Sequence, residues 1–273
     1  MASALAPIIT PTLLSAIRTQ PNLPSNTWYF ITATALSILN RPDEISSVYK
    51  YALSHGPGSF DNSPGDDEKL GMTRRIREAL VKSAAIGGLP KTINALLELK
   101  QATPPAFLDE PLATSPTQRR NEIFGTPSAE VLQRGQTYFN MVYGKITQRV
   151  MGNMDRSGTE DLGLTARLMY GYILSNTNVL TPAETSYVIL AALIPQDVNP
   201  QLKGHLKGAI NGGATVENVR AVREVVIKIC EASGMKKLSD AASGGWGWRQ
   251  DVANLDGAML AHTMQESRAF LKG

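Results

Sequence analysis

Two stretches of the chain share one pattern: TWYFITATALSILNRPDEISSVYKYAL at residues 27–53 and ETSYVILAALIPQDVNPQLKGHLKGAI at residues 184–210. In each, an apolar segment with helical spacing is followed by a short break containing proline and by a second helical segment containing lysine. Placing Ala35 on Ala192 gives an offset of 157 residues (192 − 35), and Ala52 then falls on Ala209. The recurrence predicts a chain built from two copies of one helical pair.

Four further positions repeat at a second constant offset. The pairs, each 146 residues apart, are Arg77 and Arg223, Glu78 and Glu224, Lys82 and Lys228, and Gly88 and Gly234. The two offsets differ by 11 residues (157 − 146), and this difference coincides with a loop rich in glycine and proline that is predicted at residues 55–67. The sequence therefore predicts a tandem duplication with one insertion in the first copy.

Helical periodicity extends over nearly the whole chain, and the apolar–polar alternation of β-strands is not evident. The predicted helices cover residues 28–39, 45–53, 73–85, 89–99, 129–143, 162–174, 182–193, 199–211 and 216–232. The predicted fold class is all-α.

The expected domain organisation follows from the repeat and from proline-rich stretches. An N-terminal tail at residues 1–26 precedes the first repeat at 27–100, a linker at 101–118, and the second repeat with its preceding helices at 119–235. In the C-terminal tail, residues 236–273, Trp246 and Trp248 are expected to pack on the body or on a neighbouring subunit.

Composition excludes several classes of protein. The balance of 27 Lys and Arg against 24 Asp and Glu argues against a nucleic-acid partner, and the longest apolar runs are far shorter than the ~20 residues of a membrane-spanning helix. The single cysteine, Cys230, excludes a disulfide framework, a two-thiol redox centre and a multi-thiolate zinc site. We expect Cys230 to be a small core residue, and we expect no metal and no cofactor.

These features predict a cytoplasmic protein. The alternative is a mitochondrial protein, because no acidic residue precedes Asp43 while Arg18 and weakly amphipathic apolar residues do. The residues at 270–273, FLKG, do not form a Ser-Lys-Leu peroxisomal address.

Residues 184–235 resemble the carboxymuconolactone decarboxylase family, which shares its fold with the alkyl-hydroperoxidase D-like proteins. The matching features are an apolar helix opened by a polar residue (ETSYVILAAL), a helix with one histidine (QLKGHLKGAINGGAT) and the helix after it (VENVRAVREVVIKICEASGM). The first copy, and RRNEIFGTPSAEVLQRGQTYFNMVYG at residues 119–144, resemble the decarboxylase branch. The resemblance implies an antiparallel bundle of two pseudo-symmetric repeats that forms homo-oligomers, with a trimer expected.

Peroxidase members of this fold carry a Cys-x-x-Cys pair seven and four residues before the histidine. Val198 and Gln201 occupy those positions here, and peroxide reduction through a disulfide needs both thiols. The chain is therefore not expected to be a dithiol peroxidase. The resemblance implies instead a cofactor-independent lyase that acts on a small carboxylated or lactone compound.

His205 occupies the family's histidine position, and an imidazole that titrates near neutrality suits the protonation of a carbanion. Glu184 is expected to orient this imidazole as a second catalytic residue. Three residues are expected to bind the substrate: Gln201, which lies four residues before His205 on the same helical face, and Lys203 and Lys207, which could hold a carboxylate.

His205 and Glu184 can also be explained by purely structural roles. A lone histidine is more often packed than catalytic, and Glu184 would complete a capping box with Thr181. Val48 stands in the first copy where His205 stands in the second, so at most one such site is expected in each chain. The alternative function is a catalytically silent oligomeric scaffold or a small-molecule-binding protein of the same fold.

Overall fold

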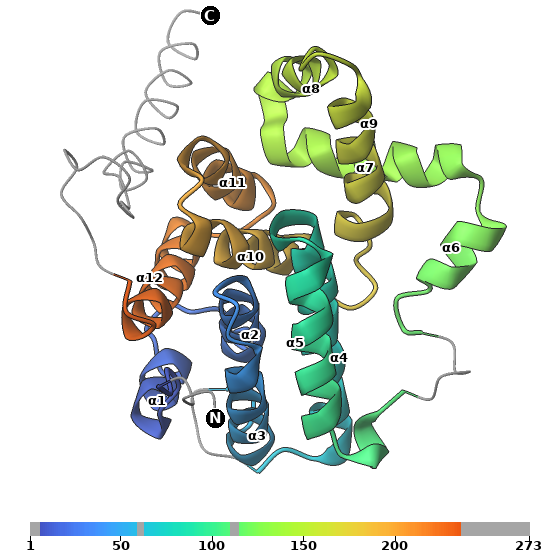
Figure 1. Ribbon diagram of the computed structural model, residues 1–273. Coiled ribbons are helices and arrows are strands. Elements are labelled where there is room, and N and C mark those ends of the chain that lie inside the picture. The colour runs from blue at the N-terminus through green and yellow to red at the C-terminus, as the bar shows by residue number, and fades with distance from the viewer. Residues whose placement is uncertain (1–5, 59–62, 110–114, 236–273) are drawn as a thin grey trace, which may run out of the picture.

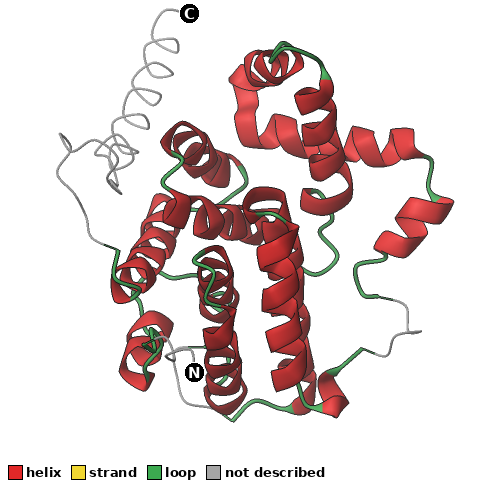
Figure 2. Cartoon of the chain, in the orientation of Figure 1, coloured by secondary structure: helices red, strands yellow, loops and turns green. Residues whose placement is uncertain are grey.

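The computed structural model describes residues 6–58, 63–109 and 115–235, and within these ranges the chain forms helices and loops without a β-strand (Figure 2). The predicted all-α class is confirmed. The C-terminal segment that contains Trp246 and Trp248 lies outside the described residues.

The helices of the first part of the chain are α1 (Pro11–Arg18), α2 (Trp28–Ile38), α3 (Ile45–His55), α4 (Asp66–Gly87) and α5 (Leu89–Ala102), with the 3-10 turns η1 (Pro42–Glu44) and η2 (Pro105–Phe107). The middle part contains α6 (Arg119–Gly125), α7 (Ser128–Tyr143), η3 (Gly144–Ile146), α8 (Thr147–Asp155), α9 (Asp161–Leu168) and the π-helical turn η4 (Met169–Leu174). The last part contains α10 (Pro182–Leu193), η5 (Ile194–Gln196), α11 (Asn199–Asn211) and α12 (Val216–Ala232).

Two apolar helices form the centre of the body. Every residue of α2 is buried, and α10 is buried from Thr185 to Leu193. Helices that are apolar on all sides are stable only when other elements surround them. Accordingly α2 and α10 contact each other, and both contact α4 and α12 (Figure 1).

The order of elements recurs along the chain. Helix α2 is followed by a 3-10 turn, α3 and α4, and helix α10 is followed by a 3-10 turn, α11 and α12. Between these two series, α7, α8 and α9 lie together on one side of the body (Figure 1), and α7 also contacts α11.

Two boundaries differ from those predicted. Helix α4 begins at Asp66 rather than at residue 73, because Asp66, Asp67 and Glu68 supply negative charge to its first turn. The N-terminal segment is also more ordered than a tail: Leu14 and Ile17 of α1 are buried in the core.

The backbones of α7 and η4 meet at glycine. A Cβ atom at Gly135 would lie 2.5 Å from the backbone nitrogen of Gly171 and 2.9 Å from the carbonyl carbon of Tyr170. Since backbone atoms cannot move aside as a side chain can, this crossing requires glycine at position 135.

We therefore expect Gly135→Ala to lower the free energy of unfolding by about 1–3 kcal/mol, measured by urea unfolding. Gly71→Ala is the matched control, because a Cβ there would have no atom within 4 Å. In a helix interior that change should raise stability by about 0.5–1 kcal/mol. Equal effects of the two changes would contradict the close crossing.

Candidate functional site

His205 lies on α11 with 6% of its surface exposed. Its Nε2 is 3.1 Å from the hydroxyl of Tyr143 on α7, and the two rings meet edge to face. Burial lowers the pKa of His205 to about 4, so the imidazole is neutral at physiological pH. The imidazole ring therefore packs between α7 and α11.

Glu184 is held by other partners. Its carboxylate caps the first turn of α10 by accepting a hydrogen bond from the backbone nitrogen of Thr181, which forms the predicted capping box. It also pairs with the guanidinium of Arg75 on α4, at 2.5 Å. Burial acts to raise the pKa of Glu184, but the bonds from Arg75 and Thr181 outweigh burial and hold the pKa below its usual value.

The three predicted substrate-binding residues, Gln201, Lys203 and Lys207, are exposed on α11, whereas His205 is buried. On α11 the buried imidazole of His205 is thus separated in exposure from the three residues predicted to bind the substrate with it. Their catalytic and binding roles stay predictions. Cys230 is buried as expected, and burial raises the pKa of its thiol to about 12, so the thiol stays protonated.

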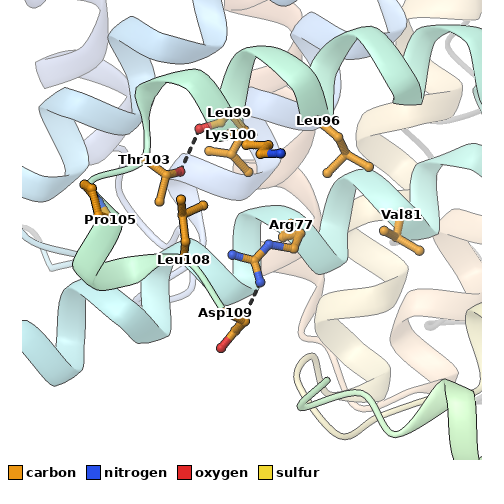
Figure 3. Close-up of a pocket in the computed structure, with 9 residues that line it drawn as sticks. All are labelled: Arg77, Val81, Leu96, Leu99, Lys100, Thr103, Pro105, Leu108 and Asp109. Carbon is orange, nitrogen blue, oxygen red and sulfur yellow. Dashed lines mark hydrogen bonds and ion pairs between the residues drawn. The ribbon is translucent and has the colours of Figure 1, made fainter. Parts of the chain in front are cut away.

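A pocket lies elsewhere, between α4, α5 and the segment that follows α5 (Figure 3). Its volume is about 630 Å³, which falls in the range of small-molecule sites. The lining residues are Arg77, Val81, Leu96, Leu99, Lys100, Thr103, Pro105, Leu108 and Asp109. None of the predicted site residues lines it.

Positive charge predominates at this pocket. Arg74 and Arg77 both pair with Asp109, at 2.8 and 2.5 Å, while Lys100 is exposed at the pocket wall. Burial acts to raise the pKa of Asp109, but the bonds from the two arginines outweigh it and keep the carboxyl ionised. Of the charged residues that line the pocket, Arg77 and Lys100 are cations and Asp109 is the carboxylate, so the lining carries an excess of positive charge and attracts anions.

A buried charged cluster lies on a neighbouring face of α4. The carboxylate of Glu78 accepts two bonds from the guanidinium of Arg119, and its Oε1 is 3.6 Å from Nζ of Lys82. Lys82 is fully buried and Glu78 nearly so. Burial lowers the pKa of Lys82 to about 7, although Glu78 acts in the opposite direction.

The cluster supplies hydrogen-bond donors at the carboxyl end of η4, where backbone carbonyl groups have no partner within the helix. Lys82 donates to the carbonyl oxygens of Ile173, Leu174 and Asn176 at 3.2, 2.7 and 2.7 Å. Arg119 donates to the carbonyl oxygen of Tyr172 at 3.0 Å. Cations at a helix carboxyl end oppose its negative partial charge, so the cluster is a structural joint between α4 and η4.

Sequence reasoning missed both the pocket and the cluster. Glu78 and Lys82 are spaced as an ordinary surface ion pair, but they lie among the apolar residues Ile76, Ala79 and Leu80 of α4. Charged residues within an apolar face were the available signal. The sequence signal for the pocket was weaker, because four of its nine lining residues come from a segment predicted to be a linker.

The chain matches no family model and no solved structure. It does match two curated proteins, both named Peroxisomal protein 2. The protein from Schizosaccharomyces pombe is 39% identical over 213 residues, which cover 78% of this chain and 89% of that protein. The protein from Saccharomyces cerevisiae is 30% identical over 257 residues, which cover 77% of this chain and 89% of that protein.

These relatives correct two predictions. The decarboxylase-like function is contradicted, because the proteins that match over most of the chain are named as peroxisomal proteins and not as decarboxylases. The packing of His205 against Tyr143, away from the pocket, agrees with this correction. The cytoplasmic localisation and its mitochondrial alternative are contradicted by the same names. Composition misled here because organelle addresses are short signals read by receptors.

His205 leads to a prediction about stability and pH. Its imidazole takes up a proton near pH 6.5 when unfolded, but only near pH 4 when buried, so the unfolded state binds more protons between these values. The protein should therefore lose roughly 3 kcal/mol of stability as the pH falls from 6.5 to 4. Urea unfolding across this window should show a shallower slope for His205→Gln. Parallel curves for the variant and the wild type would rule out this role.

Proposed function

The chain belongs to the Peroxisomal protein 2 family, and on that premise we propose that it is a peroxisomal protein that binds a small organic anion between α4 and α5. The observation that carries the binding proposal is the pocket of about 630 Å³, with apolar walls and a cationic centre. Apolar walls with a few placed polar groups are typical of ligand sites in proteins.

The charged side chains at the pocket indicate that its ligand is an anion. Arg77 reaches the pocket from α4 and Lys100 from α5, so an anion between them would link the two helices. Asp109 neutralises only part of the charge of Arg74 and Arg77. An anionic ligand would therefore compensate charge that the protein leaves in excess.

We also propose that the fold is a pair of pseudo-symmetric repeats of the alkyl-hydroperoxidase D-like type. The support is the recurrence of helix, 3-10 turn, helix and helix at α2–α4 and α10–α12. The positions of Val48 and His205 correspond in these repeats, and both are buried. This proposal concerns architecture and carries no reaction with it.

The peroxisomal location is tested by fluorescence microscopy of the tagged full chain beside a peroxisomal marker. We expect the two signals to coincide. An even distribution through the cytoplasm would contradict this part of the proposal and would leave ligand binding to be judged by itself.

The binding proposal is tested with anilinonaphthalene sulfonate, an amphipathic anion that fluoresces in apolar sites. We expect Leu96→Trp to fill the pocket and remove most of the fluorescence, because Leu96 lines it. Leu97→Trp is the matched control, since that side chain is 51% exposed on the same helix. Equal fluorescence from the two variants would place the probe outside the pocket and contradict the proposal.

Self-association is a further part of the proposal. Leu162, Leu164, Leu168 and Met169 expose large apolar side chains on α9 and the start of η4, as surfaces between subunits often do. Light scattering should give the mass of three chains for the wild type, and Leu168→Glu should lower it. Ile93→Glu, on the exposed face of α5, should leave the mass unchanged. A wild type with the mass of one chain would contradict self-association.

A further inference from the structure

The walls of the α4–α5 pocket are aliphatic. The apolar lining consists of Val81, Leu96, Leu99, Pro105 and Leu108, and none of the described residues that line the pocket is aromatic. Flat ring systems such as nucleobases are commonly stacked on aromatic side chains, which these walls do not offer. Aliphatic walls offer instead many weak contacts to a flexible hydrocarbon chain.

Charge lies in the middle of this lining. Figure 3 shows Arg77 and Lys100 between Pro105 and Leu108 on one side and Val81 and Leu96 on the other. Asp109 accepts a bond from Nη1 of Arg77, and a guanidinium carries four further N–H donors. A carboxylate group can therefore bind Arg77 without displacing Asp109, and it can pair with the exposed ammonium of Lys100 as well.

From this arrangement we propose that the pocket binds an aliphatic monocarboxylate: the carboxylate lies at Arg77 and Lys100, and the hydrocarbon chain lies against Val81, Leu96 and Leu99. The inference rests on the proposed function and specifies its ligand class. A single carboxylate neutralises the excess charge of the lining without reversing it, because two cations, Arg77 and Lys100, and one carboxylate, Asp109, line the pocket. The volume of about 630 Å³ has room for a chain of medium length.

The inference predicts a dependence on chain length. Each methylene group moved from water to the apolar wall should tighten binding by roughly fourfold until the wall is filled. Titration calorimetry of the full chain with butanoate, hexanoate, octanoate and decanoate measures this series. Decanol carries the longest chain without the charge, and we expect it to bind more weakly than decanoate.

Two variants identify the charged end of the site. Lys100→Gln should weaken decanoate about fivefold and should leave decanol unchanged, because only the carboxylate pairs with the ammonium. Lys145→Gln is the matched control, since it removes the same charge from an exposed position on η3, outside the pocket. Leu96→Trp should abolish binding of decanoate, and Leu97→Trp should not.

The possible failures are distinguishable. Equal affinity for butanoate and decanoate, or equal loss with Lys100→Gln and Lys145→Gln, would overturn the aliphatic carboxylate while leaving a pocket for some other anion. Decanoate binding that survives Leu96→Trp would place the carboxylate elsewhere and would also overturn the inference. If neither the carboxylates nor anilinonaphthalene sulfonate binds at the pocket, the proposed function itself fails.

Discussion

The joint between α4 and η4 is the constraint on which the arrangement of the helices depends. Glu78 holds the guanidinium of Arg119, and Lys82 lies one turn further along α4 with its ammonium against three carbonyl oxygens. Burial of these charges is unfavourable unless each is paired and hydrogen-bonded. The joint therefore tolerates little change in the rotation of α4 or in its distance from η4.

The rotation of α4 about its axis also determines which side chains α4 directs toward α5. Arg77 and Val81 each precede a member of the joint by one residue, so they turn toward α5 and line the pocket. On each face the two residues are four positions apart: Glu78 and Lys82 in the joint, and Arg77 and Val81 at the pocket. The contacts that fasten α4 to η4 thus position the cation and the apolar wall that we assign to ligand binding.

Sequence patterns were sufficient for elements whose apolar periodicity is strong. The helices predicted at residues 182–193, 199–211 and 216–232 agree with α10, α11 and α12 because buried faces repeat at helical spacing. The joint was not predictable in this way. Glu78 and Lys82 have the same local sequence spacing as Glu224 and Lys228, yet Glu224 is exposed and Lys228 half-buried. The difference comes from residues 119 and 172–176, which are distant in sequence.

The features of the candidate site also divide into those that the local sequence predicts and those that depend on distant segments. The capping role of Glu184 was readable from the local sequence, whereas the pairing of Glu184 with Arg75 and of His205 with Tyr143 depends on distant segments. The pocket depends on how the chain after α5 returns to α4, and short-range patterns carry no information about that return.

A double-mutant cycle of Glu78→Gln and Arg119→Gln tests the joint most directly, with the free energy of unfolding measured for all four proteins. Our account predicts a coupling energy of at least about 2 kcal/mol, because the two hydrogen bonds between the buried carboxylate of Glu78 and the guanidinium of Arg119 are lost when either residue is replaced. A coupling energy within about 0.5 kcal/mol of zero would mean that the two residues act independently. In that case the joint does not hold α4 against η4, and the account of the fold would be contradicted.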